Sequence, residues 1–225
     1  MIGGARVLAV DDRLRTSAEE FGTACPECLG QRVGMFDGRA RGKCRRVPEP
    51  VSDSMVNMEA CEICGFAWES VGDDDIPTRI VEGASFISEV LRSSAAGVVV
   101  RPTPDRWSTL EYAAHVRDVL LHVRDRLVIG LSEDNPEFKP LYREERVNFG
   151  LYAADTPQVV AAELDMAAAL FARTFVAIRP EQLDRPCQYL YPAPATRSLR
   201  WMGQQVVHEV AHHSDDIREN AAGAA

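Results

Sequence analysis

Long segments with helical hydrophobic periodicity fill most of the 225-residue chain after residue 76 and constrain its fold more than any other feature. We expect helices over residues 77–91, 109–131, 157–178 and 198–220. Ser108 and Glu111 form a capping box at the start of the second, and Pro157 suits the first turn of the third. Four long helices joined by loops at 132–155 and 179–197 predict a mainly α fold, a four-helix bundle.

The composition is that of an ordinary globular protein, with 46% apolar residues and a formal net charge of -9. This charge argues against nonspecific nucleic-acid binding by the whole chain, because neutralising phosphates requires an excess of Lys and Arg. The longest apolar runs, such as GVVV at 97–100, are far shorter than the roughly 20 residues that cross a bilayer. The N-terminus lacks the basic region and cleavage site of a secretory signal, so we expect a cytoplasmic protein without a membrane span.

Three histidines predict a metal site inside the bundle. His208 and His212 lie one helical turn apart in the run HEVAHH, so both can face one ion. His115, on the second expected helix, can complete the set from a neighbouring helix. Three protein ligands leave open coordination positions, which favour chemistry over a purely structural role. Unassigned neighbours are His122 and His213, and carboxylates that could orient an imidazole are Glu111 and Asp216.

The run HEVAH also matches the H-E-x-x-H signature of zinc metalloproteases, in which the Glu activates water. Glu209 is therefore a candidate catalytic base. The third ligand of those enzymes lies further downstream, and no His or Gly occurs at the required offset after His212. The match thus supports a metal-dependent hydrolase using Glu209 only as an alternative.

Five of the six cysteines precede residue 65. The pairs CPEC (25–28) and CEIC (61–64) have the spacing of zinc knuckles, and a glycine follows each. We expect a zinc-ribbon-like β domain over residues 1–72 and the helical bundle over 73–225. The ligands expected for a structural zinc are Cys25, Cys28, Cys61 and Cys64. Disulfides or free thiols are the alternatives, and a reducing cytosol disfavours disulfides.

A basic stretch over residues 32–46 lies between the two cysteine pairs. Zinc ribbons often bind nucleic acids or proteins through such a surface. Only one aromatic side chain, Phe36, lies among these charges to stack on bases, which favours a solvated hairpin. Partner binding by the ribbon stays an alternative.

Four runs together resemble the actinobacterial branch of the DinB-like superfamily. They are RPTPDRWSTLEYAAHVRDVL (101–120), SEDNPEFKP (132–140), TPQVVAAELDMAAALFA (156–172) and VVHEVAHHSDDI (206–217). CEICGF (61–66) also resembles a segment that precedes the bundle in such proteins, so the resemblance spans about residues 60–220. It implies an up-down four-helix bundle that holds zinc or nickel through three histidines, which by position are His115, His208 and His212.

This superfamily is similar to mycothiol-dependent maleylpyruvate isomerases and bacillithiol transferases, whose metal activates a low-molecular-weight thiol. The resemblance therefore implies a metal-dependent thiol S-transferase that uses mycothiol as cosubstrate and acts on an electrophilic small molecule. A three-His site leaves the ion its full charge, so a bound thiol loses its proton readily. Tyr189, Tyr191 and Trp201 are candidates to line the substrate mouth, although aromatic residues near the end of a bundle more often serve packing alone.

Another class of function stays open beside the enzymes. The chain could be a noncatalytic metal-binding or interaction protein, in which the ribbon recognises a protein or nucleic-acid partner and the bundle is a scaffold. The alanine-rich helix over 159–178 suggests a homodimer, because small side chains let helices approach closely.

Overall fold

The computed structural model describes residues 60–93, 97–191 and 193–223 of the protein. Cys25, Cys28 and the basic stretch over 32–46 lie outside these ranges. The zinc ribbon, its four-thiolate zinc and the domain boundary at residue 72 therefore stay predictions.

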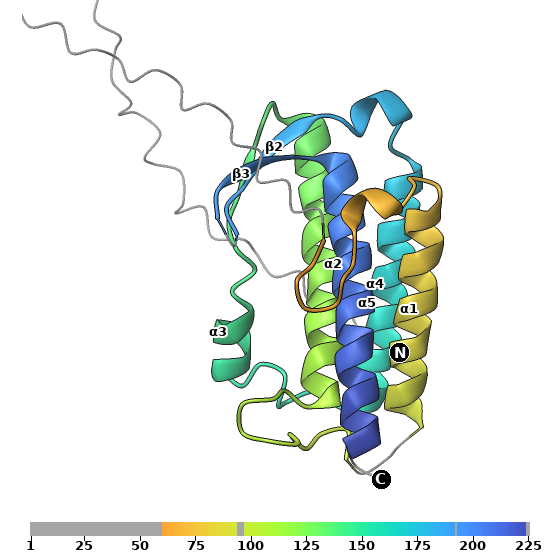
Figure 1. The fold of residues 1–225 in the computed structure, drawn as a ribbon, viewed down its shortest axis with the longest axis vertical. Coiled ribbons are helices and arrows are strands. Elements are labelled where there is room, and N and C mark those ends of the chain that lie inside the picture. Colours follow the sequence, from red (N-terminus) through yellow and green to blue (C-terminus); the bar gives the residue numbers. More distant parts are fainter. Residues whose placement is uncertain (1–59, 94–96, 192, 224–225) are drawn as a thin grey trace, which may run out of the picture. The chain divides into compact units, whose positions relative to one another are not determined.

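Four long helices form a bundle (Figure 1). They are α1 (Asp75–Arg92), α2 (Thr109–Ser132), α4 (Pro157–Val176) and α5 (Leu199–Gly223). Their bounds lie within a few residues of the ranges predicted from hydrophobic periodicity. The mainly α, four-helix fold is thereby confirmed.

The start of α2 is fixed by the predicted capping box. The Ser108 hydroxyl accepts a hydrogen bond from the Glu111 amide at 3.2 Å, and the Glu111 carboxylate accepts one from the Ser108 amide at 2.8 Å. Glu111 also binds Arg101 at 2.7 Å, so its carboxylate serves the helix end. Because this end is fixed, the direction in which His115 projects one turn later is fixed too.

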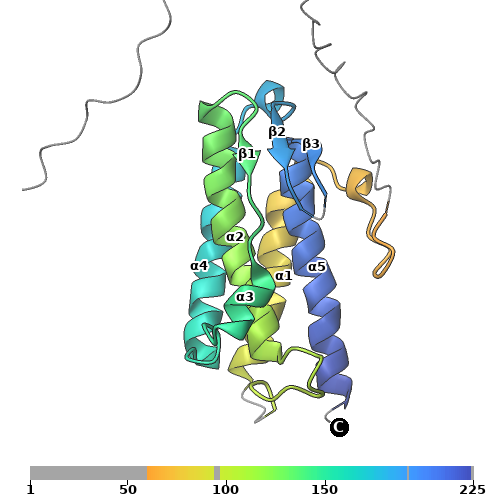
Figure 2. The same ribbon diagram turned by 90° about the vertical axis from the view of Figure 1, so that its left-hand side faces the viewer.

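The helices are not arranged in a simple up-down order. Both α1 and α2 pack against α4 and α5, and they contact each other much less. Arg117 in the first half of α2 pairs with Glu163 in the first half of α4 at 2.5 Å, so these two neighbours run parallel. The connection between them returns along the bundle (Figures 1 and 2). The up-down order implied by the resemblance therefore differs from the structure in this pair.

The loops predicted from the sequence contain short elements. They are β1 (Glu137–Phe138), α3 (Arg143–Asn148), the 3-10 turn η3 (Pro180–Gln182), β2 (Pro186–Tyr189) and β3 (Ala195–Ser198). The strands form a small sheet in the order β1-β2-β3, parallel between the first pair and antiparallel between the second. This sheet lies at the end of the bundle where α5 begins (Figure 1).

The core is a continuous apolar cluster between the four helices. Phe171 is fully buried and stacks on Phe175, with ring centroids 6.2 Å apart. A Cβ atom at Gly203 of α5 would lie 2.4 Å from the Phe175 ring. Glycine is therefore required where this aromatic ring meets α5.

The described residues before α1 pack onto α5. They include the 3-10 turn η2 (Trp68–Ser70), in which Trp68 is only 4% exposed. Val71 joins the core, and the Gln204 side chain on α5 donates a hydrogen bond to its carbonyl at 3.0 Å. This segment is thus bound to the bundle by both apolar and polar contacts.

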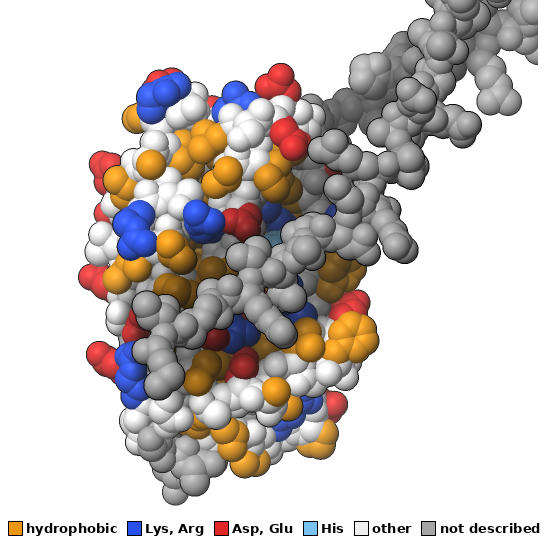
Figure 3. Space-filling view, turned by 180° about the vertical axis from the view of Figure 1, so that it is seen from behind, with side chains coloured by type: hydrophobic (Ala, Val, Ile, Leu, Met, Phe, Trp, Pro, Cys, Tyr) orange, Lys and Arg blue, Asp and Glu red, His pale blue; other side chains and the backbone are white. Residues whose placement is uncertain are grey.

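The visible described surface in Figure 3 mixes acidic, basic and hydrophobic side chains. No broad patch of one charge stands out among the described side chains on that face. Among the described residues, none of the helices combines the length and apolar character needed to cross a membrane.

Candidate metal centre

Three metal-binding side chains meet in the bundle between α2 and α5. They are His115, Glu209 and His213, and one donor atom from each lies within 4.8 Å of the others. The Glu209 carboxylate oxygen Oε2 is 3.4 Å from His115 Nε2 and 3.5 Å from His213 Nε2. Glu209 and His213 are one helical turn apart, so they project from α5 on the same side. We call this set the bundle triad.

The bundle triad is largely shielded from solvent. The side chains of His115 and His213 are 2% and 7% exposed, whereas that of Glu209 is 19% exposed. Trp107 packs edge-on against His115 at 5.6 Å, and Tyr112 stacks on His213 at 5.3 Å. Glu209 is therefore the member of the triad most accessible to solvent within the part of the chain that the structure describes.

Asp216 orients one of the imidazoles. Its Oδ2 lies 2.8 Å from His213 Nδ1, so this nitrogen donates the hydrogen bond and Nε2 faces Glu209. Metal-binding histidines typically give their second nitrogen to such a carboxylate, which fixes the tautomer. Asp216 therefore plays the orienting role predicted for it, and it does so on His213, since its distance to His212 is 3.9 Å.

Glu209 is held from its other side by two side chains. Gln205, one turn earlier on α5, donates a hydrogen bond to Glu209 Oε1 at 2.7 Å. The indole N–H of Trp68 donates to Gln205 Oε1 at 2.8 Å. One carboxylate oxygen is thus fixed by this relay, and the other faces the two histidines.

The charges of the bundle triad suit a cation. Burial opposes ionisation of Glu209, but hydrogen bonds and charge from His115 and His213 outweigh burial and hold its pKa well below the usual range. Burial lowers the pKa of His115, which keeps its imidazole neutral with a lone pair available. Burial also acts to lower the pKa of His213, but Asp216 and Glu209 reverse that effect and raise it. A metal ion would displace the proton that His213 holds.

The donor set fits a divalent transition metal. Two imidazole nitrogens and one carboxylate oxygen form a common catalytic zinc set, with a further position left for substrate or water. His115 Nδ1 is buried and has no hydrogen-bond partner within the described residues. His115 faces Glu209 through Nε2, so a metal ion at the triad would bind that nitrogen and leave Nδ1 without a partner among these residues.

Comparison with known proteins identifies the family. The model of the DinB superfamily matches residues 87–217, which include all of the bundle triad. The chain belongs to the DinB superfamily. It has no significant match among curated proteins.

Two solved structures resemble this DinB protein. YfiT from Bacillus subtilis, described as a probable metal-dependent hydrolase with an unusual four-helix bundle topology, superimposes with a TM-score of 0.61 at 16% identity. The match covers 68% of this chain and 90% of YfiT. A mycothiol-dependent maleylpyruvate isomerase gives a TM-score of 0.55 at 14% identity, over 68% of this chain and 63% of the isomerase. At these identities the likeness establishes the fold.

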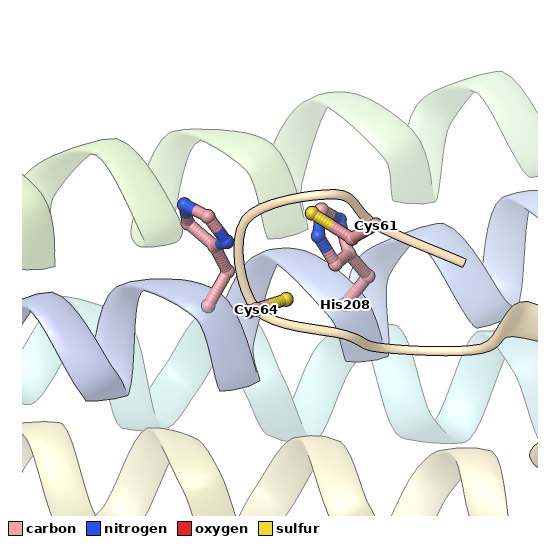
Figure 4. Close-up of side chains that lie close together, drawn as sticks. Cys61, Cys64 and His208 are labelled. Carbon is pink, nitrogen blue, oxygen red and sulfur yellow. The ribbon is translucent and has the colours of Figure 1, made fainter.

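The structure divides the histidines of this DinB bundle differently from the sequence prediction. His115, His208 and His212 do not form one group of donor atoms; His115 lies with Glu209 and His213. His208 and His212 lie instead with Cys61 and Cys64. Figure 4 shows both thiols beside His208, on the loop that precedes α1. Glu209, predicted as a catalytic base, is one of the three possible donors of the bundle triad.

Other predicted residues lie nearby. His122 is on α2, and its Nε2 is buried without a hydrogen-bond partner among the described residues. Burial, aided by Arg126 and Arg146, lowers its pKa to about 4. Tyr189 packs edge-on against Trp201 at 5.0 Å, whereas Tyr191 is 48% exposed. The Glu111 carboxylate accepts the capping hydrogen bond at the start of α2 and forms an ion pair with Arg101.

Asp216→Asn should weaken metal binding at the bundle triad by about 10–100-fold, because the orienting carboxylate no longer fixes the His213 tautomer. A competition titration with a chromophoric chelator would measure the affinity. Asp215→Asn is the matched control, since Asp215 is 58% exposed and pairs with Arg218 at 2.6 Å. Equal losses in both variants would exclude a specific role for Asp216.

Proposed function

We propose that this DinB protein is a metal-dependent thiol S-transferase that adds a low-molecular-weight thiol, such as mycothiol, to an electrophilic small molecule. The observation that carries the proposal is the bundle triad, a buried two-His, one-carboxylate set that is open mainly beside Glu209. The likeness in fold to a mycothiol-dependent isomerase supports it. Addition across an electrophilic double bond forms one S–C bond, and the thiol proton ends on the neighbouring carbon.

A divalent metal held by His115, Glu209 and His213 would act as a Lewis acid that lowers the pKa of a thiol bound to it. The protein side chains keep the site in order. Asp216 holds the His213 tautomer, and Gln205 and Trp68 hold the Glu209 carboxylate. Trp107 and Tyr112 exclude water from the imidazoles.

A two-His, one-carboxylate zinc set can activate either water or a thiol, since hydrolases also use it, so the acidity of the nucleophile decides between them. A negatively charged ligand reduces the positive charge of the site compared with three neutral histidines. Glu209, as a ligand, is also no longer free to serve as a general base. A thiol with a pKa of about 8.5 needs a much smaller shift near neutral pH than water at about 15.7.

The surface around Tyr189 and Trp201 is suited to an electrophile that carries a carboxylate. The guanidinium of Arg197 lies 4.7 Å from the Trp201 ring, whereas Arg126, 5.0 Å from the Tyr189 ring, is only 4% exposed. Positive charge beside the Trp201 ring favours a planar, conjugated anion. We therefore propose a conjugated carboxylic acid as the class of substrate.

Metal-dependent hydrolysis is the second candidate. It is favoured by the higher TM-score and coverage of YfiT, the probable hydrolase. The two activities differ in a simple respect, because only transfer requires a thiol.

The proposal is tested by measuring whether the protein consumes an α,β-unsaturated carboxylic acid only when mycothiol is present. The zinc- and nickel-loaded proteins should form a thioether or a thiol-dependent isomer, detected by mass spectrometry and chromatography, and His213→Ala should lose at least about 100-fold of this activity. The same proteins are assayed for ester and amide hydrolysis without thiol. Hydrolysis alone would support the second candidate, and no turnover with either metal would leave the noncatalytic binding role.

A further inference from the structure

We propose that Cys61, Cys64, His208 and His212 form a second, closed zinc site that fastens the segment before α1 onto α5. The donor atoms of all four residues lie within 4.8 Å of one another. Figure 4 shows the two thiols and His208 on facing parts of the loop and the helix. This site shares no residue with the bundle triad, although His212 also lies with His213 and Asp216, and its role is structural.

The spacing of the four residues is typical of zinc. Cys61 and Cys64 are separated by two residues and His208 and His212 by three, which fits the C-x2-C and H-x3-H spacings of Cys2His2 sites. A tetrahedral zinc with such ligands places their donor atoms roughly 3.3–3.8 Å apart. Small side-chain rotations would bring the present group to that geometry.

The cysteine loop has the backbone of a metal-binding knuckle. The Gly65 amide donates to the Cys61 carbonyl and the Cys61 amide to the Phe66 carbonyl, both at 2.8 Å. Gly65 has φ +71°, a left-handed conformation that favours glycine. The turn places the sulfur atoms of Cys61 and Cys64 within 4.8 Å of each other.

Three of the four ring nitrogens of the two histidines have no hydrogen-bond partner among the described residues, and the fourth, His212 Nε2, lies 3.9 Å from Asp216. Both ring nitrogens of His208 and the Nδ1 of His212 are buried, and within the described residues none of them has a hydrogen-bond partner. The His208 ring packs against Phe66 at 5.3 Å and Trp68 at 4.9 Å, so the segment that carries the cysteines also encloses the imidazole. Buried polar atoms without partners require an explanation, and a metal ion supplies one here.

Helix α5 contributes residues to both sites, and these residues alternate along its sequence. His208 and His212 belong to the proposed zinc site, while Glu209 and His213 belong to the bundle triad. Trp68, four residues after Cys64, donates to Gln205, which in turn holds Glu209. Fastening the segment with zinc therefore also fixes the relay that positions a ligand of the bundle triad.

Zinc stoichiometry of full-length variants tests the proposal against the four-cysteine ribbon. Cys61→Ser/Cys64→Ser and His208→Ala/His212→Ala should each lose one zinc ion per chain by elemental mass spectrometry, and Cys25→Ser/Cys28→Ser should lose none. Loss of zinc in the Cys25/Cys28 variant would overturn the proposal in favour of the ribbon. Retention in either of the first two variants would overturn it as well.

If the cysteine or histidine variants fail to fold, X-ray absorption spectroscopy at the zinc edge can still identify the ligands of the ion. His115→Ala serves as the sample, because it removes a ligand of the bundle triad and leaves the four proposed ligands unchanged. The remaining zinc should have two sulfur neighbours at about 2.3 Å and two nitrogen neighbours at about 2.0 Å. Four sulfur neighbours, or none, would overturn the proposal. This readout does not depend on enzymatic activity, so it stands apart from the proposed function.

Discussion

His115→Ala should remove the metal ion of the bundle triad and with it the thiol-dependent activity. His115 is the one donor that α2 contributes, so the variant leaves only Glu209 and His213 on α5. Removing an outer carboxylate partner costs about 10–100-fold in affinity, and loss of a direct ligand should cost more than about 100-fold. Elemental mass spectrometry of the purified variant should therefore find one ion fewer per chain than in the wild type.

His122→Ala provides the matched control for this experiment. His122 lies on the same helix with a buried ring nitrogen, yet it belongs to none of the donor groups found within the described residues. The control should keep its full metal content and its activity. An unchanged metal content in His115→Ala, or an equal loss in both variants, would show that α2 does not supply a ligand at His115.

Phe171→Ala should destabilise the protein by about 3–5 kcal/mol, because it leaves a cavity at the centre of the bundle. The side chain is fully buried and stacks on Phe175, which in turn meets α5 at Gly203. Neighbours held in a packed bundle core relax little into such a space, so the cost includes both the lost burial of the ring and the cavity left behind. Urea unfolding of the metal-loaded protein would measure the change in the free energy of unfolding.

Val176→Ala is the corresponding surface change on α4. Val176 is 71% exposed, so its removal should alter the free energy of unfolding by less than about 0.5 kcal/mol. If Phe171→Ala cost no more than this control, the packing described for the core of the bundle would be incorrect.

The helices could be predicted from the sequence because local signals agree with the hydrophobic pattern. Ser108 with Glu111, and Thr156 with Pro157, mark helix starts that the structure confirms. The sheet could not be predicted in the same way. Its strands are two to four residues long and include Pro186, so neither length nor alternation distinguishes them from loop. Long-range pairing with residues near 137 creates this sheet.

A cluster of possible metal-binding side chains was predictable from the sequence, but which of them lie together was not. The i, i+4 rule applies equally to His208 with His212 and to Glu209 with His213. The rotation of α5 about its axis decides which pair faces His115, and that rotation depends on the packing of the whole bundle. One signal was available in the sequence, since an acidic residue and a histidine one turn apart form a catalytic metal pair as readily as two histidines do.

The pair His208 and His212 acquires possible partners only through contacts between distant parts of the sequence. CEIC lies more than 140 residues before His208, and nothing local connects the two. The order Cys-x2-Cys followed by His-x3-His was visible, but the expected ribbon assigned the cysteines to Cys25 and Cys28. The structure brings the knuckle against α5 through Trp68 and Val71. Contacts at such sequence separation are beyond the reach of motif spacing.

Anomalous X-ray scattering from crystals of the zinc-loaded protein tests the central claim most directly, because it locates each ion among its ligands. We expect two zinc peaks beside α5, one among His115, Glu209 and His213 and the other among the ligands Cys61, Cys64, His208 and His212. A single peak shared by His115, His208 and His212 would contradict this account and restore the ligand set predicted from the sequence.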